Sequence, residues 1–378
     1  MHRFAGTWLM ISTKPLFQPT AFRRVVFVVA CLSLGGCYYV KVGSGQLGVL
    51  IGRVPIDDVL AHGGLSPDER RRLALVPRVL TFARERMGLS TGGSYRTFYD
   101  TGSGPISWNV QACAKTSFKR HRWWFPLVGR LPYKGFFELE NAHEEAEELK
   151  RRGLDVSVSE VPAYSTLGWF DDPVFRSMLH GSDLWLIETL LHELAHATVF
   201  REGDATFNES LATFVGERGA LEMATALHGP GSRQVKGAEA RQHDARLFSR
   251  VIGDLHRRLD LLYRSDRTRK EKLQRRSAIF EDARVGFAAY RRKRFLTAGY
   301  RWFQRAKLDN CMVLAYRTYH KDLDTFEDVH RLTGGGWQKT LAVFQAAADA
   351  EKPFTYLSDW RYRAWSRRFR VALRRGGD

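Results

Sequence analysis

The segment Leu190-Leu191-His192-Glu193-Leu194-Ala195-His196-Ala197 contains a His-Glu-x-x-His pattern inside an apolar run. On an α-helix, residues four positions apart lie one turn above each other on the same face. His192 and His196 can therefore offer two imidazoles to one metal ion. Glu193 lies one step round the helix, close enough to act on a metal-bound water. The pattern is typical of zinc hydrolase sites.

The helix expected around this pattern has a broad apolar surface. Its apolar positions are Leu186, Ile187, Leu190, Leu191, Leu194 and Ala195. Ser182 or Asp183 can cap its first turn, and we expect it to run to about Phe200 and to close at Gly203. Burying two histidines and a glutamate together is costly unless they are paired or bound to metal. The burial of this helix therefore favours a metal site.

The clearest strand pattern in the chain precedes the site helix. Residues Asp155 to Val161 alternate apolar and polar side chains, which predicts a half-buried strand. In zinc proteases, an edge strand before the site helix lends backbone groups to an extended peptide. We therefore expect this strand to lie beside the site.

A third metal ligand is expected from the next helix, because a catalytic zinc ion needs three protein ligands and one open position. Glu209 fits, since the chain after His196 is long enough to end one helix, turn at Gly203 and begin another near Thr206. An alternative remains open from the spacing alone. Thr206-x-x-Glu209 also matches a capping box, in which Glu209 only caps its own helix.

The 378-residue chain, 44% of it hydrophobic, is long enough to bury a sizeable core. Short aromatic segments such as Ile106–Val110 predict strands, whereas a helical pattern dominates beyond residue 230 and predicts one long helix over Arg267–Gln304. We predict an α+β, mostly helical fold. Residues 37–230 form a catalytic core with a small mixed sheet, the site helix and the third-ligand helix. Residues 231–378 form a long helical part packed on that core.

The N-terminal 36 residues are expected to form a lipoprotein signal peptide. Arg23-Arg24 precede the short apolar run Val25–Leu34, and Leu34-Gly35-Gly36-Cys37 resembles a bacterial lipobox. Cleavage before Cys37 and acylation of Cys37 would then anchor the chain to a membrane. A plain signal peptide or a buried strand are the alternatives. By resemblance to Gram-negative lipoproteins, Tyr38 after the cysteine favours the outer membrane, facing the periplasm.

The formal net charge of +18 allows nucleic acid, anionic lipid or acidic polymers as partners. The basic runs contain no recognisable nucleic-acid-binding module, so no nucleic acid partner is expected. We interpret the basic helices as a solvated face that lies against anionic lipid headgroups.

The cysteines give no thiolate zinc site, because the sequence has no Cys-x-x-Cys pair. Cys31 and Cys37 fall within the expected leader region. Cys113 and Cys311 remain as one candidate disulfide pair, although nothing in the sequence places them within bonding reach.

The segment Asn208-Glu209-Ser210-Leu211-Ala212 resembles the Asn-Glu-x-x-Ala segment that supplies the third ligand in gluzincins. Together with Leu191–His196 and the preceding Ala163–Pro173, it resembles a bacterial family of lipoproteins described as "putative zinc aminopeptidases". The resemblance implies a zincin-like core, one Zn²⁺ held by His192, His196 and Glu209, and Glu193 as the general base. The sequence differs from thermolysin-like enzymes at Thr213, four residues after Glu209, where those enzymes have an Asp.

The resemblance implies a zinc-dependent aminopeptidase that hydrolyses peptides in the cell envelope. The donor that stabilises the transition state is open, and the candidates are Tyr164, Tyr316, Tyr319 and His320. Each of these side chains also fits a core or surface aromatic position. A non-catalytic, zinc-stabilised envelope scaffold is the alternative function.

Overall fold

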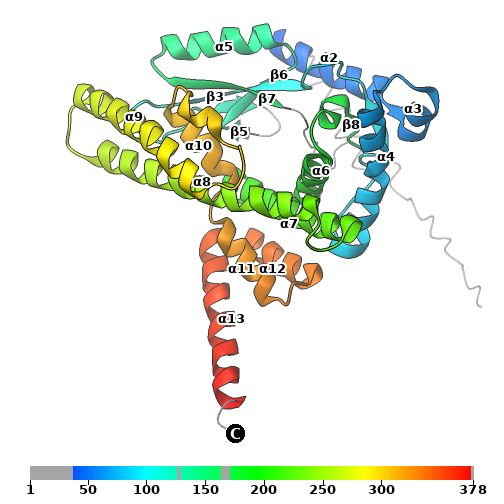
Figure 1. Ribbon diagram of the computed structural model, residues 1–378. Coiled ribbons are helices and arrows are strands. Elements are labelled where there is room, and N and C mark those ends of the chain that lie inside the picture. The colour runs from blue at the N-terminus through cyan, green and yellow to red at the C-terminus, as the bar shows by residue number, and fades with distance from the viewer. Residues whose placement is uncertain (1–36, 126–128, 162, 164–170, 376–378) are drawn as a thin grey trace, which may run out of the picture.

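A computed structural model of the chain describes residues 37–125, 129–161, 163 and 171–375. The expected leader, residues 1–36, and the candidate Tyr164 lie outside these residues. The described chain is mostly helical with small sheets, as the sequence predicts. Figure 1 shows a small sheet at one end of the body, a central pair of helices, and a helical C-terminal part below.

Helix α2 (Cys37–Gly52) begins the described chain. The short, mixed pattern of Tyr38–Ile56 does not predict this helix, since its glycines lower helix propensity. Tertiary packing accounts for the difference. The hydroxyl of Tyr38 donates a hydrogen bond to Gly135 O at 3.0 Å, and Gly45 lies directly against the ring of Phe137. The missing side chain at Gly45 is thus what allows the helix to lie close to this ring.

Two helices follow α2 in the chain. Helix α3 (Ile56–His62) packs against α4 (Pro67–Phe82), which contacts the site helix and ends in a π-helical turn (Ala83–Met87). Helix α4 begins with a capping box. Ser66 Oγ accepts from Glu69 N at 3.3 Å, and Glu69 Oε2 accepts from Ser66 N at 2.8 Å. These bonds satisfy backbone groups that a helix N-terminus leaves free.

The main sheet has the order β6-β3-β7 and is antiparallel throughout. It consists of β3 (Ser107–Cys113), β6 (Tyr133–Phe136) and β7 (Asp155–Val161), so the predicted strand over 155–161 is confirmed. Helix α5 (Leu139–Arg151) covers one face of this sheet (Figure 1). Within the described part of the chain, β7 pairs only with β3 and is therefore an edge strand.

Two smaller β-structures complete the strand content. The strands β1 (Val54–Pro55), β2 (Thr97–Tyr99) and β8 (Val174–Phe175) form a three-stranded sheet. The strands β4 (Trp123–Phe125) and β5 (Gly129–Leu131) form an antiparallel ribbon. The short aromatic segments therefore form short strands. The predicted segment Ile106–Val110 lies largely within β3.

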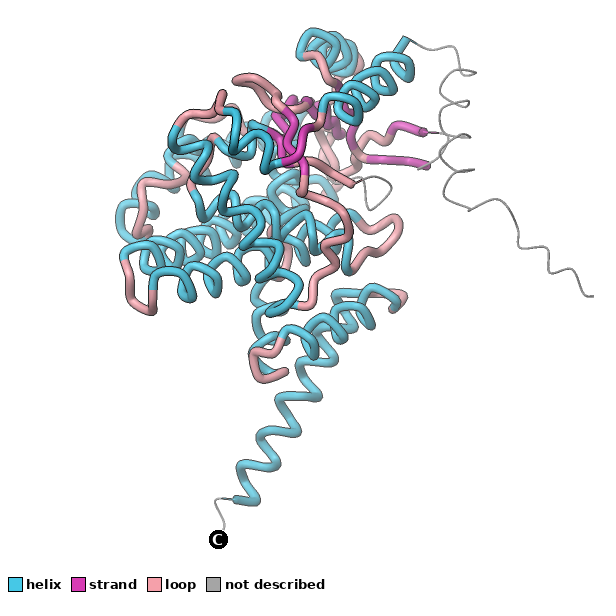
Figure 2. The backbone as a smooth tube through the Cα atoms, turned by 90° about the vertical axis from the view of Figure 1, so that its right-hand side faces the viewer, coloured by secondary structure: helices cyan, strands magenta, loops and turns pink. Residues whose placement is uncertain are grey.

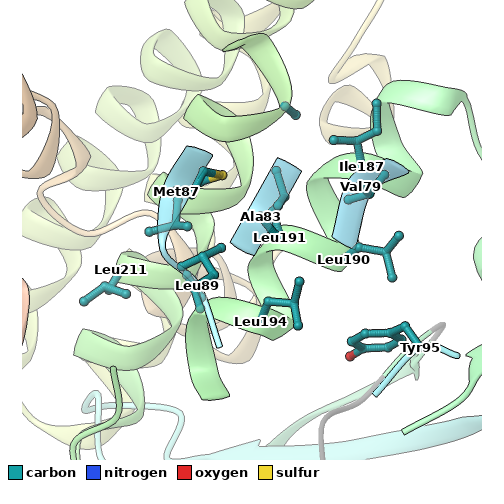
Figure 3. Close-up of a cluster of buried hydrophobic side chains, with 14 of the residues drawn as sticks. Val79, Ala83, Met87, Leu89, Tyr95, Ile187, Leu190, Leu191, Leu194 and Leu211 are labelled. Carbon is teal, nitrogen blue, oxygen red and sulfur yellow. The ribbon is translucent and has the colours of Figure 1, made fainter. Parts of the chain in front are cut away.

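The central helices α6 (Asp183–Thr198) and α7 (Ala205–His228) pack closely against each other. Gly216 permits this approach, because a Cβ atom there would lie 2.7 Å from Glu188 O on α6. On its other side, α6 buries Leu190, Leu191 and Leu194 against the π-helical turn and Leu89 (Figure 3). The broad apolar surface of α6 is therefore covered from two directions, and its polar residues are held in a fixed orientation.

The C-terminal half is helical from residue 233 onward. Helices α8 (Arg233–Arg264) and α9 (Arg269–Arg294) pack against each other, followed by a 3₁₀ turn (Arg301–Gln304) and α10 (Asn310–Tyr319). The prediction of one helix over Arg267–Gln304 is wrong. The chain leaves the helix because the buried carboxylate of Asp244 accepts bonds from Leu296 N and Thr297 N, each at 2.8 Å.

The last three helices are α11 (Leu323–Leu332), α12 (Trp337–Asp349) and α13 (Pro353–Arg375). They share the core that also surrounds α6 and α7. The far end of α13 projects away from the body (Figure 2). None of the helices over residues 37–375 combines the length and the apolar character needed to cross a bilayer.

Candidate metal centre

The two histidines of the pattern project from consecutive turns of α6. Ser182 Oγ accepts a hydrogen bond from Trp185 N at 3.2 Å and caps the helix, as the sequence predicts. The helix ends at Thr198, before the expected end near Phe200, so the turn to the next helix begins several residues before Gly203. His192 Nε2 and His196 Nε2 lie 3.2 Å apart. The (i, i+4) spacing thus brings both imidazoles to one point.

Glu209 meets these imidazoles from α7. Its Oε2 lies 3.2 Å from His192 Nε2 and 3.5 Å from His196 Nε2. The capping-box alternative for Glu209 is wrong, because Asp204 caps α7 by accepting from Phe207 N at 3.0 Å. Glu209 is therefore free to serve the site rather than its own helix end.

The geometry of the three atoms fits a metal ion. Ligand atoms ~2.1 Å from a tetrahedral zinc ion are separated by about 3.4 Å. The distances of 3.2, 3.2 and 3.5 Å match this separation. Within the described residues, this is also the group of His, Cys, Asp and Glu side chains that could hold a metal ion. Two imidazole nitrogens and one carboxylate oxygen form a donor set that suits zinc.

The charges of the site favour an ionised Glu209. Burial raises the pKa of Glu209, but hydrogen bonds with His192 and His196 outweigh it and lower the pKa to about 2. Burial lowers the pKa of His196, but the hydrogen bond with Glu209 and the charge of that carboxylate raise it by more, so the net shift is upward. A cation is therefore stabilised between these groups, and a metal ion can take the place of the proton.

Glu193 has the opposite electrostatic character. Burial raises its pKa, and the opposing influence of His192 and His196 does not cancel the effect. A carboxylate with a raised pKa binds a proton more readily, which suits a group that accepts a proton and passes it on in a catalytic cycle. The site thus contains an ionised ligand carboxylate and, beside it, a carboxylate suited to carry a proton.

Comparison with known proteins shows the family to which the chain belongs. The sequence profile of a family described as "Putative aminopeptidase" matches residues 37–354, which include the three ligand candidates and Glu193. The chain belongs to this family. No curated protein and no solved structure matches the chain.

Two further residues of the Asn208–Ala212 segment hold the candidate metal centre of this aminopeptidase-family chain in place. Asn208 closes the turn between α6 and α7, since its Oδ1 accepts from Arg201 N at 2.9 Å and its Nδ2 donates to Arg201 O at 2.7 Å. Ser210 is fully buried, and its Oγ donates to Thr318 O at 3.0 Å and accepts from Lys321 N at 3.1 Å. The segment thus positions the ligand and the end of α10 together.

Of the candidate transition-state donors, the structure brings Tyr319 to the centre. Its ring stacks on His192 with a centroid distance of 6.1 Å, and its side chain remains 40% exposed. Partial desolvation by the surrounding protein raises the pKa of Tyr319 above its usual range although part of the residue stays exposed, and the carboxylates of Glu209 and Glu193 raise it further. Tyr319 therefore keeps its proton and remains a hydrogen-bond donor.

Tyr316 and His320 have different surroundings. Tyr316 lies against Phe248 in the second core, and its hydroxyl donates to Ala245 O at 3.5 Å. His320 stacks on Tyr316 at 4.0 Å, and its pKa is lowered to about 4, first by burial. Both residues support the end of α10. Tyr316 packs in the second core, whereas the charge of His192 also contributes to the lowered pKa of His320.

The sequence pattern does not point to two tyrosines that lie near the centre. Tyr133 comes from β6, and its pKa is raised by burial and by Glu209 and Glu193. Tyr95 is buried, has a positive φ of 61°, and its pKa is raised by burial and then by Glu193. Both residues are brought in by long-range packing, which no local spacing in the sequence reveals.

Proposed function

We propose that this chain is a zinc-dependent peptidase, and that it is an aminopeptidase of the gluzincin type. The observation that carries the proposal is the convergence of His192 Nε2, His196 Nε2 and Glu209 Oε2 beside Glu193. Family membership supports the peptidase class. The alternative of a non-catalytic scaffold does not require a carboxylate with a raised pKa next to the ligands.

Each residue near the site has a separate role in the proposed reaction. When bound, zinc would supply Lewis acidity that activates a water molecule and polarises the peptide carbonyl. Glu193 accepts a proton from the attacking water and then transfers it to the leaving amine. Tyr319 donates a hydrogen bond to the oxygen on which negative charge develops. The edge of β7 that pairs with no strand among the described residues accepts the extended peptide and sets its direction.

Metal analysis tests the ligand assignment. The purified protein is expected to contain one zinc ion per chain, and Glu209→Ala is expected to contain none after dialysis against a weak chelator. Glu202→Ala removes an exposed carboxylate on the preceding loop and serves as the control. Equal zinc content in wild type and Glu209→Ala would remove Glu209 from the site.

A second variant separates the enzyme from the scaffold. Glu193→Gln is expected to retain zinc and to lose activity by about 10²–10⁴-fold, because it removes the general base alone. The substrates are peptide libraries with free and with acetylated N-termini. Cleavage only of free N-termini supports an aminopeptidase, whereas equal cleavage of both sets would establish an endopeptidase. Unchanged cellular function in Glu193→Gln would favour the scaffold.

We also propose an envelope location through acylation of Cys37. The support is the order of charged, apolar and small residues before this cysteine. Expression with a radiolabelled fatty acid should label the wild-type chain and leave Cys37→Ser unlabelled. Labelling of Cys37→Ser to the same extent would contradict the lipid anchor.

A further inference from the structure

Cys113 and Cys311 meet inside the protein although they lie 198 residues apart in the chain. Cys113 ends β3, and Cys311 is the second residue of α10. Their Sγ atoms are 3.0 Å apart, and both residues are almost completely buried, with 1% and 2% of their surfaces exposed. The separation is within about 1 Å of the ~2.05 Å length of a disulfide bond.

The groups around the two thiols hold them in this position. Asn310 N donates to Asp155 Oδ2 at 3.1 Å, and Arg276 Nη2 donates to the same oxygen at 2.6 Å. Asn310 Nδ2 donates to Ala114 O at 2.8 Å, directly beside Cys113. A buried, fully paired network therefore fixes the start of α10 against the ends of β3 and β7. The two sulfur atoms are held together by this arrangement rather than by a flexible loop.

We propose that Cys113 and Cys311 form an intramolecular disulfide bond in the mature protein. The reaction joins the two Sγ atoms, and the two thiols together lose two electrons and two protons. A disulfide oxidant, such as oxidised glutathione or a thiol–disulfide oxidoreductase, accepts them and is reduced to two thiols. One cysteine thiolate first attacks the oxidant's disulfide, and the second then displaces the oxidant's remaining sulfur.

The environment determines when this bond forms. The hydrogen bond with Cys113 and burial both raise the pKa of Cys311 far above its usual range, so the reactive thiolate is rare in the folded protein. Oxidation is therefore expected during folding, before α10 docks on the sheet. Once formed, the buried bond is expected to resist reductants until the protein unfolds.

The bond connects the sheet to the metal centre through α10. Cys113 forms a β-bridge with Arg120, whose guanidinium donates to Leu314 O in the middle of α10 at 2.9 Å. The last turn of α10 carries Thr318, the partner of Ser210, and Tyr319, which stacks on His192. A covalent attachment at the first turn of α10 thus stabilises the helix whose other end forms one wall of the site.

Peptide mapping of the full-length protein tests the bond. The protein is refolded with oxidised and reduced glutathione, alkylated, digested with trypsin and analysed by mass spectrometry. We expect residues 97–115 linked to residues 308–317, with loss of the link on reduction in denaturant. Detection of both peptides only as alkylated thiols, or linked to Cys31 or Cys37, would overturn the proposal.

Thermal unfolding supplies a second readout, with Cys311→Ala as the control variant that cannot form the bond. The loop that the bond closes is long, so wild-type protein that is refolded and scanned with a phosphine reductant, which keeps the bond from forming, should unfold at a midpoint roughly 5–10 °C below that of the oxidised protein. The midpoint of Cys311→Ala should not depend on the phosphine reductant. A wild-type midpoint that is equally indifferent to reduction would overturn the stabilising role of the bond.

Discussion

Glu209 and Glu217 lie about two turns apart on α7, and both lie near α6, yet their pKa values shift in opposite directions. Glu209 meets two imidazoles, which hold its pKa at about 2 despite burial. Burial raises the pKa of Glu217, and the carboxylate of Glu188 on α6 raises it further. Two glutamates on one helix thus have opposite pKa shifts. The facing helix α6 places histidines beside Glu209 and a carboxylate beside Glu217.

This difference shows what makes a carboxylate a ligand. Withdrawal from water penalises both glutamates, so burial alone does not separate them. The partner across the α6–α7 interface decides whether the carboxylate is charged. The ionised form of Glu209 is favoured and attracts a cation, whereas burial and Glu188 favour the protonated form of Glu217. Exchange of the partners, rather than of the buried carboxylates, should therefore convert one end into the other.

The largest effect is expected for zinc affinity. Glu209→Gln should weaken zinc binding by roughly 1,000-fold or more, since loss of an outer-shell partner alone typically costs 10–100-fold. Glu217→Gln removes a carboxylate from the same helix and should leave zinc affinity unchanged. Competition titration with a fluorescent chelator measures both variants. Similar losses in the two variants would mean that the interface, and not the ligand set, controls zinc binding.

The next effect concerns two tyrosines on α10. Tyr319→Phe should lower kcat by roughly 100-fold with little change in zinc content, as for removal of one oxyanion donor. Tyr316→Phe removes a hydroxyl from the second core and should retain most of the activity. Steady-state kinetics on a free N-terminal peptide checks this pair. If Tyr316→Phe loses more activity than Tyr319→Phe, the donor assignment is wrong.

The close approach of α6 and α7 gives a smaller effect on stability. Gly216→Ala places a Cβ atom 2.7 Å from Glu188 O, so the helices must separate at a cost of about 1–3 kcal/mol. Gly237→Ala in α8 meets no atom within 4 Å and should instead stabilise its helix by up to about 1 kcal/mol. Thermal unfolding of both variants measures the difference. Equal midpoints for the two variants would show that the interface can relax around a methyl group.

The smallest effect is a pH dependence at the Glu217 end. A glutamate whose pKa is raised on folding binds its proton more tightly in the folded state, so its contribution is present below the unfolded pKa and is lost as the pH rises. Glu217→Gln should therefore stabilise the protein by about 1–2 kcal/mol at pH 8. This advantage should disappear near pH 4. Urea unfolding at both pH values tests the sign, and a larger gain at pH 4 would contradict it.

The sequence predicts the local features of this protein well. The His192–His196 spacing, the Ser182 cap and the strand over residues 155–161 all depend on interactions between near neighbours, and the structure confirms them. The convergence on Glu209 was predictable once a helix–turn–helix was expected. The rejection of the capping box required Asp204, whose role depends on where α7 begins.

Features that depend on distant contacts were not predictable. Helix α2 packs through Gly45 against Phe137 and through Gly52 against Tyr99, and the break at Arg294 depends on Asp244 from another helix. Tyr133 reaches the centre from β6 only after the sheet has assembled. In each case the deciding partner is far away in the sequence and adds no periodic signal to it.

The hydrogen bonds of Ser210 limit how α7 can rotate about its own axis. Consecutive helix residues point about 100° apart, so Glu209 is directed at α6 while Ser210 is directed at α10. Rotation that brings either residue closer to its partner moves the other residue away. The helix thus has a single angular setting at which Glu209 contacts α6 and Ser210 contacts α10 at the same time. Because the partners of Ser210 are the backbone atoms Thr318 O and Lys321 N, this setting depends on the hydroxyl at position 210 and on the path of the α10 backbone, whichever side chains follow there.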